Sequence, residues 1–193
     1  MRQQLVLAST SSYRRALLER LGVPFTVCAP QVEENRHPGE APQDMARRLA
    51  REKALAVAKH FPNAILIGSD QVAVVEGEIF GKPGNHAAAA RQLRSLSGRE
   101  AVFHTGLCVH NAATVVTQTR VIPFYVAFRK LSDETIERYL LREQPYDCAG
   151  SAKSEGLGIA LIAKMTGDDP HALIGLPLIA LVDMLHEQGF DVV

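Results

Sequence analysis

The sequence has few cysteines and no tryptophan. Its three cysteines, Cys28, Cys108 and Cys148, are odd in number, lie far apart and include no CxxC pair. Disulfide frameworks need paired cysteines, and structural zinc sites use closely spaced ones. This pattern argues against both kinds of site, and it indicates a reducing compartment.

The sequence also lacks an excess of charge of either sign and a long apolar run. Lys and Arg together number 21, as do Asp and Glu, so no net field attracts nucleic acid or an anionic membrane. The N-terminal apolar run Leu5–Ala8 is too short for a signal peptide, and no stretch reaches the roughly 18 apolar residues of a membrane span. We therefore expect a cytoplasmic protein that binds neither a nucleic acid polymer nor a membrane, with any anion site being local.

The length and composition are those of an ordinary globular chain. With 193 residues, 47% of them hydrophobic, the chain can bury one good core, with room for two lobes that flank a groove. It contains no internal repeat and no linker that clearly divides it. The sequence therefore predicts a single domain over residues 1–193.

The most informative stretch of the chain is centred on Asp70. Ile65–Ile67 is a continuous apolar run, typical of a strand that is covered on both faces, and Gly68 interrupts it. The sequence thus predicts a carboxylate at the rim of a buried strand, although a lone Asp is more often a turn residue or a helix cap. A hairpin predicted around residues 76–77 would bring Lys82 close to this carboxylate.

A turn rich in hydroxyl groups, residues 9–12, connects a strand predicted over residues 4–8 to a helix. The first turn of that helix holds Arg14 and Arg15 and no acid before Glu19. Because a helix N-terminus carries free N–H groups and partial positive charge, it normally favours acidic side chains. The arrangement predicts an external anion at this turn; the alternative is that both arginines face solvent.

Lys53 is the unusual residue of a helix predicted from Pro42 to about His60. At 100° per residue Lys53 falls within the apolar arc, whereas Arg47, Arg51 and the other cations of this helix lie on the opposite side. A buried, unpaired ammonium would be costly, so Lys53 needs an acidic partner or a bound phosphate. The alternative is a side chain that reaches the surface at the helix end.

The rest of the chain alternates between strand and helix patterns. Strands are predicted over 25–28, 101–110, 114–128 and 159–162, and helices over 86–96, 132–142 and 177–189. A loop of small residues at 145–158 would let a ligand approach the backbone. Glu33 and Glu34, in a polar loop, are candidates for a divalent metal or for simple exposure to water.

Together, these unusual residues fit a polyphosphate that carries a metal ion. Arg14, Lys53 and Lys82 would neutralise phosphate oxygens, N–H groups of residues 9–12 would hold a terminal phosphate, and Asp70 would activate a water associated with the metal. The Walker pattern GxxxxGK[ST] is absent, and no GxGxxG follows a strand. The phosphate site must therefore be of another kind.

Eight short motifs strengthen this interpretation. They are, in order, ASTSSYRR (8–15), VE (32–33), EKA (52–54), GSDQV (68–72), GKP (81–83), LSG (96–98), TG (105–106) and GLPL (175–178). In this order they resemble the motifs of the Maf family of nucleoside triphosphate pyrophosphatases, over nearly the whole chain. The family's usual proline is replaced by Ser12.

The resemblance implies an α/β fold in which helices flank a mixed, twisted sheet and two lobes surround a deep nucleotide-binding cleft. It also implies homodimers, dependence on a divalent cation such as Mg or Mn, and hydrolysis of a nucleoside triphosphate to a monophosphate and diphosphate. Asp70 would be the proton acceptor and, with Glu33, a metal ligand. The phosphate region would be lined by Ser9, Arg14, Lys53 and Lys82.

Three positions are similar to the subgroup that acts on 7-methyl-GTP. Pyrimidine-directed members are expected to have Arg, Thr and Gln where this chain has Tyr13, Gln71 and Glu155. A carboxylate at Glu155 can accept both guanine N–H donors, and Gln71 could donate to O6. Methylation at N7 makes the base cationic, so Tyr13 would add about 0.5 to 2 kcal/mol of cation–π attraction. Two alternatives stay open: a dTTP or UTP pyrophosphatase of the same family, and a non-catalytic nucleotide-binding regulator of cell division.

Overall fold

The computed structural model describes residues 3–193, which form two interleaved compact units. The first unit comprises the chain up to Gln71 together with Thr105–Ile122 and Asp169–Val193. The second comprises Val72–His104 and Pro123–Asp168. The chain passes between the units several times, which explains why no linker is visible in the sequence. The single domain over 1–193 and the deep cleft stay predictions.

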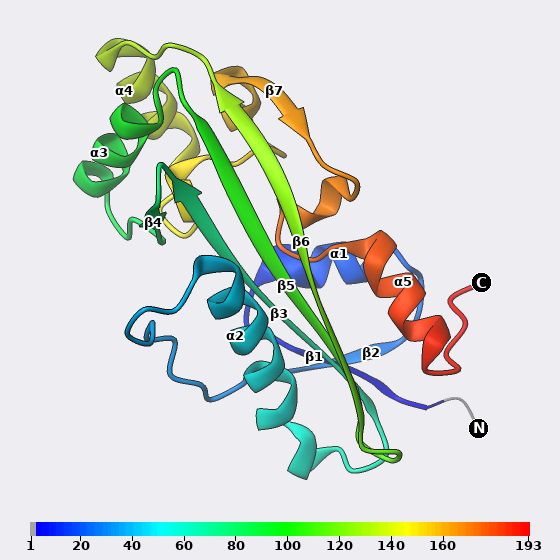
Figure 1. Cartoon of the computed structure of the whole chain (residues 1–193). Coiled ribbons are helices and arrows are strands. Elements are labelled where there is room, and N and C mark those ends of the chain that lie inside the picture. The colour runs from blue at the N-terminus through cyan, green and yellow to red at the C-terminus, as the bar shows by residue number, and fades with distance from the viewer. Residues whose placement is uncertain (1–2) are drawn as a thin grey trace. The chain divides into compact units, whose positions relative to one another are not determined.

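The secondary structure follows the alternation predicted from the sequence (Figure 1). The helices are α1 (Ser12–Glu19), α2 (Pro42–Ala56), α3 (His86–Leu96), α4 (Asp133–Glu143) and α5 (Leu178–Glu187). The strands are β1 (Leu5–Ala8), β2 (Phe25–Cys28), β3 (Ile65–Val75), β4 (Glu78–Phe80), β5 (Glu100–Asn111), β6 (Val116–Phe128) and β7 (Ile162–Thr166). Short 3₁₀ helices occur at Ala58–His60, Ala149–Ser151, Leu157–Leu161 and Pro170–Ala172.

The strands form one mixed sheet, as the predicted α/β class requires. Their hydrogen-bonded order is β2-β1-β3-β5-β6-β7, and β4 pairs with β3 beside this path. β1 is parallel to both β2 and β3, whereas β3 with β4 and β6 with β7 are antiparallel. The turn between β3 and β4 has positive φ at Glu76 (50°) and Gly77 (88°), which suits a two-residue hairpin. The predicted hairpin is confirmed.

In the first unit, β1 and β3 are covered on both faces. One cluster packs Leu5, Leu7, Ile65 and Ile67 against residues of α1 and α5, and the other packs Val6, Ala8 and Leu66 against residues of α2. Figure 1 shows α2 on one side of these strands and α1 with α5 on the other. This two-sided burial follows from the alternation of side chains along a strand. It confirms the interpretation of the apolar run at Ile65–Ile67.

The predicted break at Gly68 is wrong. β3 continues through Gly68 to Val75, because this glycine serves a close contact rather than a turn. A Cβ atom at Gly68 would lie 2.1 Å from the carbonyl oxygen of Ala50 and 2.7 Å from the backbone nitrogen of Ala54, both on α2. Asp70 therefore lies within a long strand rather than at its rim.

The strand predicted over 159–162 is also wrong. Residues Leu157–Leu161 form a 3₁₀ helix, and the strand β7 begins only at Ile162. The apolar run is not buried on both faces, since Ile159 is 49% exposed. The backbone also folds back on itself here: a Cβ atom at Gly158 would lie 2.5 Å from the carbonyl oxygen of Lys153. Such a contact requires a turn and excludes an extended conformation.

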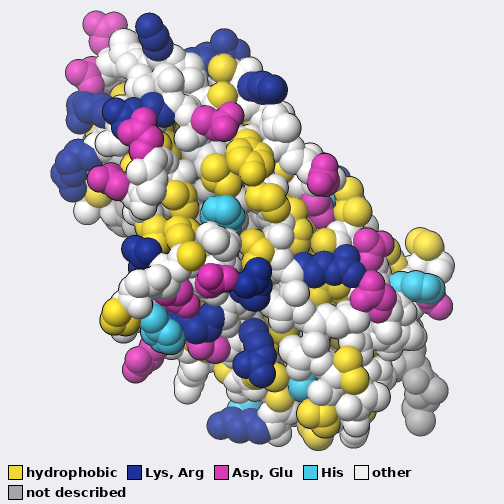
Figure 2. All heavy atoms as spheres, in the orientation of Figure 1, with side chains coloured by type: hydrophobic (Ala, Val, Ile, Leu, Met, Phe, Trp, Pro, Cys, Tyr) yellow, Lys and Arg dark blue, Asp and Glu magenta, His cyan; other side chains and the backbone are white. Residues whose placement is uncertain are grey.

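Charged side chains of both signs are interspersed on the face drawn in Figure 2, in keeping with the zero net charge.

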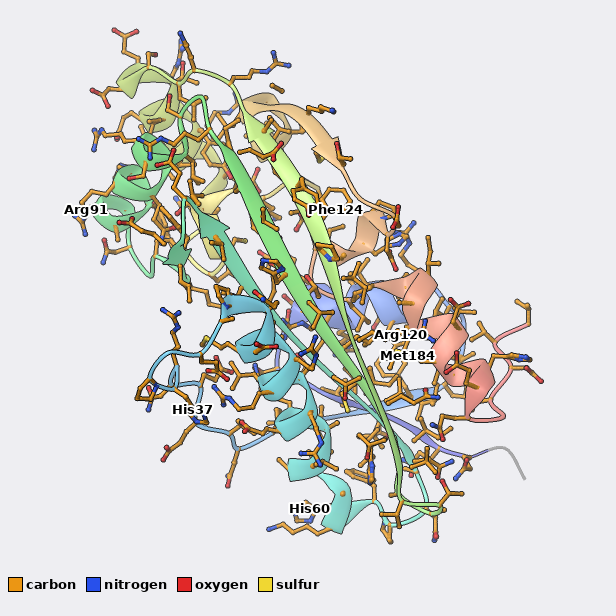
Figure 3. All side chains as sticks on the ribbon, in the orientation of Figure 1. His37, His60, Arg91, Arg120, Phe124 and Met184 are labelled. Atoms are coloured by element: carbon orange, nitrogen blue, oxygen red, sulfur yellow. The ribbon has the colours of Figure 1, made fainter. Side chains whose placement is uncertain are left out.

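Within the first unit, Arg120 of β6 pairs with Glu187 of α5, with 2.6 Å between Nη2 and Oε1, while Met184 of α5 is fully buried (Figure 3). In the described part of the chain, no helix is both long and apolar enough to cross a bilayer.

Candidate active site

Lys53 of α2 and Asp70 of β3 form a buried ion pair in the first unit. Lys53 is 6% exposed and Asp70 is 7% exposed, and Lys53 Nζ donates to Asp70 Oδ1 over 2.6 Å. The close approach of α2 at Gly68 explains the pairing, because residues 68 and 70 share one face of the strand. The acidic partner predicted for Lys53 is therefore present.

A second carboxylate contacts the same ammonium group. Glu34 Oε1 lies 2.6 Å from Lys53 Nζ, and its loop is held to α2 by Arg48. Arg48 Nε donates to Glu40 Oε1 over 2.6 Å, and its Nη2 donates to the carbonyl oxygen of Asn35 over 3.1 Å. Lys53 thus lies between a buried carboxylate on the sheet and an exposed one on the loop.

The surroundings of Asp70 and Arg14 shift the pKa values of both side chains. Burial raises the pKa of Asp70, while Lys53 and Arg14 oppose this shift and Glu34 adds to it. Burial lowers the pKa of Arg14, and the charges of Asp70 and Glu34 counteract that change. Asp70 therefore holds a proton more readily than an exposed aspartate would, which is the property required of a general base near neutral pH.

Serine side chains of the turn before α1 accept from two N–H groups, one in the turn and one in the first turn of the helix. Ser9, which is buried, accepts from the N–H of Ser11 over 3.1 Å. Ser11 is the N-cap and accepts from the N–H of Arg14 over 3.4 Å. The first turn contains no acidic residue, as the sequence predicted. Because these two amides already have acceptors, the side chain of Arg14 is the stronger candidate donor to an anion here.

The guanidinium of Arg14 is oriented by a backbone carbonyl distant in sequence. Its Nε donates to the carbonyl oxygen of Gly175 over 2.8 Å. Ser69, the neighbour of Asp70, donates from Oγ to the same oxygen over 2.8 Å and to the carbonyl oxygen of Gly106 over 2.9 Å. One carbonyl group therefore ties α1 to β3 beside Asp70.

Gln71 also contacts the segment that contains Gly175. Its Nε2 donates to the carbonyl oxygens of Ala172 and Leu173 over 2.8 Å and 3.0 Å, and lies 3.1 Å from Thr105 Oγ1. To donate to guanine O6, Gln71 Nε2 would have to break one of these hydrogen bonds. The specificity role of Gln71 stays a prediction, and the structure adds a second role in holding this segment.

Asp169 is a buried acid that the sequence analysis above did not single out. It is 3% exposed, whereas its neighbour Asp168 is exposed. Its carboxylate accepts three backbone N–H groups. The Asp-Pro pair signals a turn, but no local sequence signal separates the buried acid from the exposed one.

Four other predicted site residues keep their assignments as predictions. Glu33 is exposed, and Tyr13 is half-buried on α1. Lys82 and Glu155 belong to the second unit, and both are exposed.

Side chains of α4 hold the loop that carries Glu155. Glu143 accepts from the N–H of Leu157 over 2.7 Å and pairs with Lys153 Nζ over 3.2 Å, and the hydroxyl of Tyr139 accepts from the N–H of Lys153 over 3.0 Å. These contacts give Glu155 a fixed backbone position within its unit.

The donor set suits a hard divalent cation that arrives with a substrate. In the described part of the chain, no group of three or more His, Cys, Asp or Glu residues could hold a metal ion. The oxygen donors near Lys53 are the carboxylates of Asp70 and Glu34. Mg²⁺ commonly binds through one or two carboxylates together with substrate phosphates, and these two carboxylates are of that kind.

Comparison with known proteins identifies the family. Residues 4–188 match the family model described as Maf-like protein. The chain belongs to the Maf family. The resemblance inferred from the motifs is therefore confirmed.

Three relatives of this Maf family chain share one name. A protein of Methylobacillus flagellatus named 7-methyl-GTP pyrophosphatase is 59% identical over 98% of each chain. Proteins with that name from Nitrosospira multiformis and Nitrosococcus oceani are 56% and 53% identical, over 99% and 97% of this chain and 96% and 94% of their own lengths.

Proposed function

We propose that this protein is a nucleoside triphosphate pyrophosphatase that hydrolyses 7-methyl-GTP to 7-methyl-GMP and diphosphate. The observation that carries the reaction class is the buried Asp70, paired with Lys53 and within electrostatic reach of Arg14. The choice of base is supported by the shared name of relatives that align over nearly the full chain.

In the proposed reaction, Asp70 is the general base. The oxygen of water bonds to the α-phosphorus. The bond between that phosphorus and the oxygen that bridges to the β-phosphate breaks, and diphosphate leaves with the bridging oxygen. Asp70 accepts the proton that the attacking water loses, and its raised pKa suits this task. Lys53 orients the carboxylate through Oδ1 and keeps positive charge next to it.

The positive groups of the site would bind the triphosphate. Arg14 presents a guanidinium fixed at Nε by Gly175, and arginine suits bidentate contact with phosphate. We assign Ser9, Lys53 and Lys82 to the same phosphate region. A divalent cation, Mg or Mn, would be held by Asp70 and Glu33, and when bound it neutralises phosphate charge and acidifies a water molecule.

The methylated base would be selected by Tyr13, Gln71 and Glu155. A cationic ring is attracted to the aromatic face of Tyr13 and to the carboxylate of Glu155, whereas unmodified GTP lacks that positive charge. We further propose that the protein acts in the cytoplasm as a homodimer. Sedimentation equilibrium at micromolar concentration would test the dimer.

A nucleotide panel tests the function directly. Diphosphate release is measured with 7-methyl-GTP, GTP, dTTP and UTP, each with Mg and with Mn, and kcat/KM is compared. We expect the highest value for 7-methyl-GTP. Faster hydrolysis of dTTP or UTP would instead indicate a pyrimidine-directed enzyme. Tight nucleotide binding with no diphosphate release from any member would indicate a nucleotide-binding regulator.

A further inference from the structure

Asp169 joins the two ends of one segment of the first unit. At the start of the segment, Asp169 Oδ1 accepts from the N–H of His171 over 3.1 Å. At its end, Oδ2 accepts from the N–H groups of Ile179 and Ala180, over 2.8 Å and 3.2 Å. These two donors belong to the first turn of α5, whose N-cap Pro177 makes no side-chain capping bond and which has no acid in that turn. Asp169 therefore caps α5 from outside the helix.

Residues 170–178, between these anchor points, direct carbonyl groups toward the candidate site. The carbonyl oxygen of Gly175 accepts from Arg14 Nε and Ser69 Oγ, both over 2.8 Å. The carbonyl oxygen of Ala172 accepts from Gln71 Nε2 and from Thr105 Oγ1, both over 2.8 Å. Side chains from α1, β3 and β5 thus converge on one short segment.

The direction of the Gly175 carbonyl depends on an unusual backbone conformation. Gly175 has a φ of 113°, in a region that residues with a side chain rarely adopt. A segment of this kind keeps its shape only while its ends are fixed. The carboxylate of Asp169 fixes both ends, and it is buried where water does not compete for its hydrogen bonds.

We propose that Asp169 is a positioning residue for the triphosphate site, acting through the carbonyl oxygens of residues 170–178 on Arg14. This inference rests on the proposed function for its substrate. It predicts a defect in phosphate binding, because the group that Asp169 orients is the cation assigned to phosphate. A residue needed only for folding would lower stability without a selective effect on phosphate affinity.

The central experiment compares Asp169→Asn with Asp168→Asn. Asparagine keeps the size of Asp169 but replaces one acceptor oxygen with an NH₂ group, which cannot accept from a backbone N–H. We expect KM for 7-methyl-GTP to rise about tenfold to hundredfold, with a smaller change in kcat, since a small displacement of a binding group has effects of this order. The exposed neighbour Asp168 should tolerate the same change with kinetic constants equal to those of the wild type. Wild-type KM for Asp169→Asn would overturn the proposal.

A double-mutant cycle separates positioning from folding. Affinity for inorganic triphosphate is measured by calorimetry for wild type, Arg14→Ala, Asp169→Asn and the double variant. If Asp169 acts through Arg14, the double variant should bind about as weakly as Arg14→Ala alone. Fully additive losses would overturn the proposal. Because this probe has no base and needs no turnover, the cycle still tests Asp169 if 7-methyl-GTP proves not to be a substrate.

A milder variant covers the case in which Asp169→Asn does not fold. Thr105→Val removes the hydroxyl that donates to the Ala172 carbonyl and accepts from Gln71 Nε2, and it keeps the side-chain shape. We expect the affinity for triphosphate to fall by a smaller factor than in Asp169→Asn. We also expect hydrogen exchange at the amides of residues 171–180 to become faster. Unchanged affinity and unchanged exchange in this variant would contradict the proposed coupling.

Discussion

Lys53 Nζ lies 2.6 Å from Asp70 Oδ1, and both side chains are almost fully buried. The pair combines two effects on Asp70: burial raises its pKa, and the ammonium opposes that shift. Lys53 therefore offsets part of the cost of burying a charged carboxylate at Asp70. The pair also fixes the direction of Oδ1 toward α2.

Replacing Asp70 with Asn should remove the proposed general base while keeping the shape of the side chain. We expect turnover of 7-methyl-GTP to fall about 10²-fold to 10⁴-fold, the usual contribution of general base catalysis. Nucleotide affinity, measured by calorimetry, should be largely retained. Wild-type turnover in Asp70→Asn would exclude Asp70 as the base.

Removing Lys53 should destabilise the protein. In Lys53→Met, Asp70 loses its buried partner, and such a loss costs about 3 to 5 kcal/mol. The control is Arg15→Ala, which breaks the exposed Arg15–Glu19 pair, whose side chains are 64% and 52% exposed; such pairs contribute about 0 to 1 kcal/mol. Urea unfolding at neutral pH measures both. Equal losses in the free energy of unfolding for the two variants would show that the buried pair contributes no more to stability than the exposed pair.

Gly68→Ala should disturb the packing that brings α2 close to Asp70. The added Cβ atom would meet backbone atoms of α2, which cannot move as a side chain could, so we expect a loss of about 1 to 3 kcal/mol or more. We also expect lower turnover, because separation of α2 from β3 would lengthen the contact between Lys53 and Asp70. Gly81→Ala is the matched control, since a Cβ atom added there would have no neighbour within 4 Å. Equal unfolding midpoints for the two variants would contradict the close-contact interpretation.

Glu40 should contribute a pH-dependent part of the stability. Its hydrogen bond from Arg48 lowers the pKa of Glu40 from 4.5 to about 2. Since the folded pKa lies below the unfolded one, the carboxylate stabilises the fold fully above about pH 4.5. This contribution is lost as the pH falls toward 2. We therefore expect Glu40→Gln to be less stable than wild type at pH 7 and to approach it near pH 2, as measured by urea unfolding. A constant difference between the two proteins across this range would contradict the assignment.

Lys82→Ala tests a residue whose role stays a prediction. Direct contact of its ammonium with phosphate should contribute about 1.5 to 3 kcal/mol to nucleotide binding. Calorimetric titration with 7-methyl-GTP measures the loss, and Lys59→Ala, at an exposed position after α2, is the control. Unchanged affinity in Lys82→Ala would remove this residue from the phosphate region.

The features that could be predicted from the sequence are those set by local pattern. The apolar arc of α2 predicted that Lys53 faces inward and needs an acidic partner or a bound phosphate; its burial is confirmed, and Asp70 is the acidic partner. The helix predicted after residues 9–12 is also confirmed as α1, whereas the external anion at its start stays a prediction. The periodicity of apolar residues was enough to predict these features, because each feature depends on residues that lie close together in the chain.

The features that could not be predicted depend on contacts between distant residues. Gly68 could mark either a turn or a close approach, and only the position of α2 decides between them. Glu33 and Glu34 are adjacent acids, yet it is Glu34 that pairs with Lys53. Asp169 differs from Asp168 only in burial, which the tertiary structure sets.

The hydrogen bond from Arg14 to Gly175 spans 161 residues of sequence, and this span has a consequence for biosynthesis. During translation the N-terminal helix leaves the ribosome long before the carbonyl group that orients its arginine has been made. A nascent chain that ends before Gly175 would therefore lack this orientation of Arg14 at the proposed phosphate site, even with Asp70 and Lys53 already synthesised. Only a chain that has been synthesised past Gly175 would have the guanidinium of Arg14 oriented in this way.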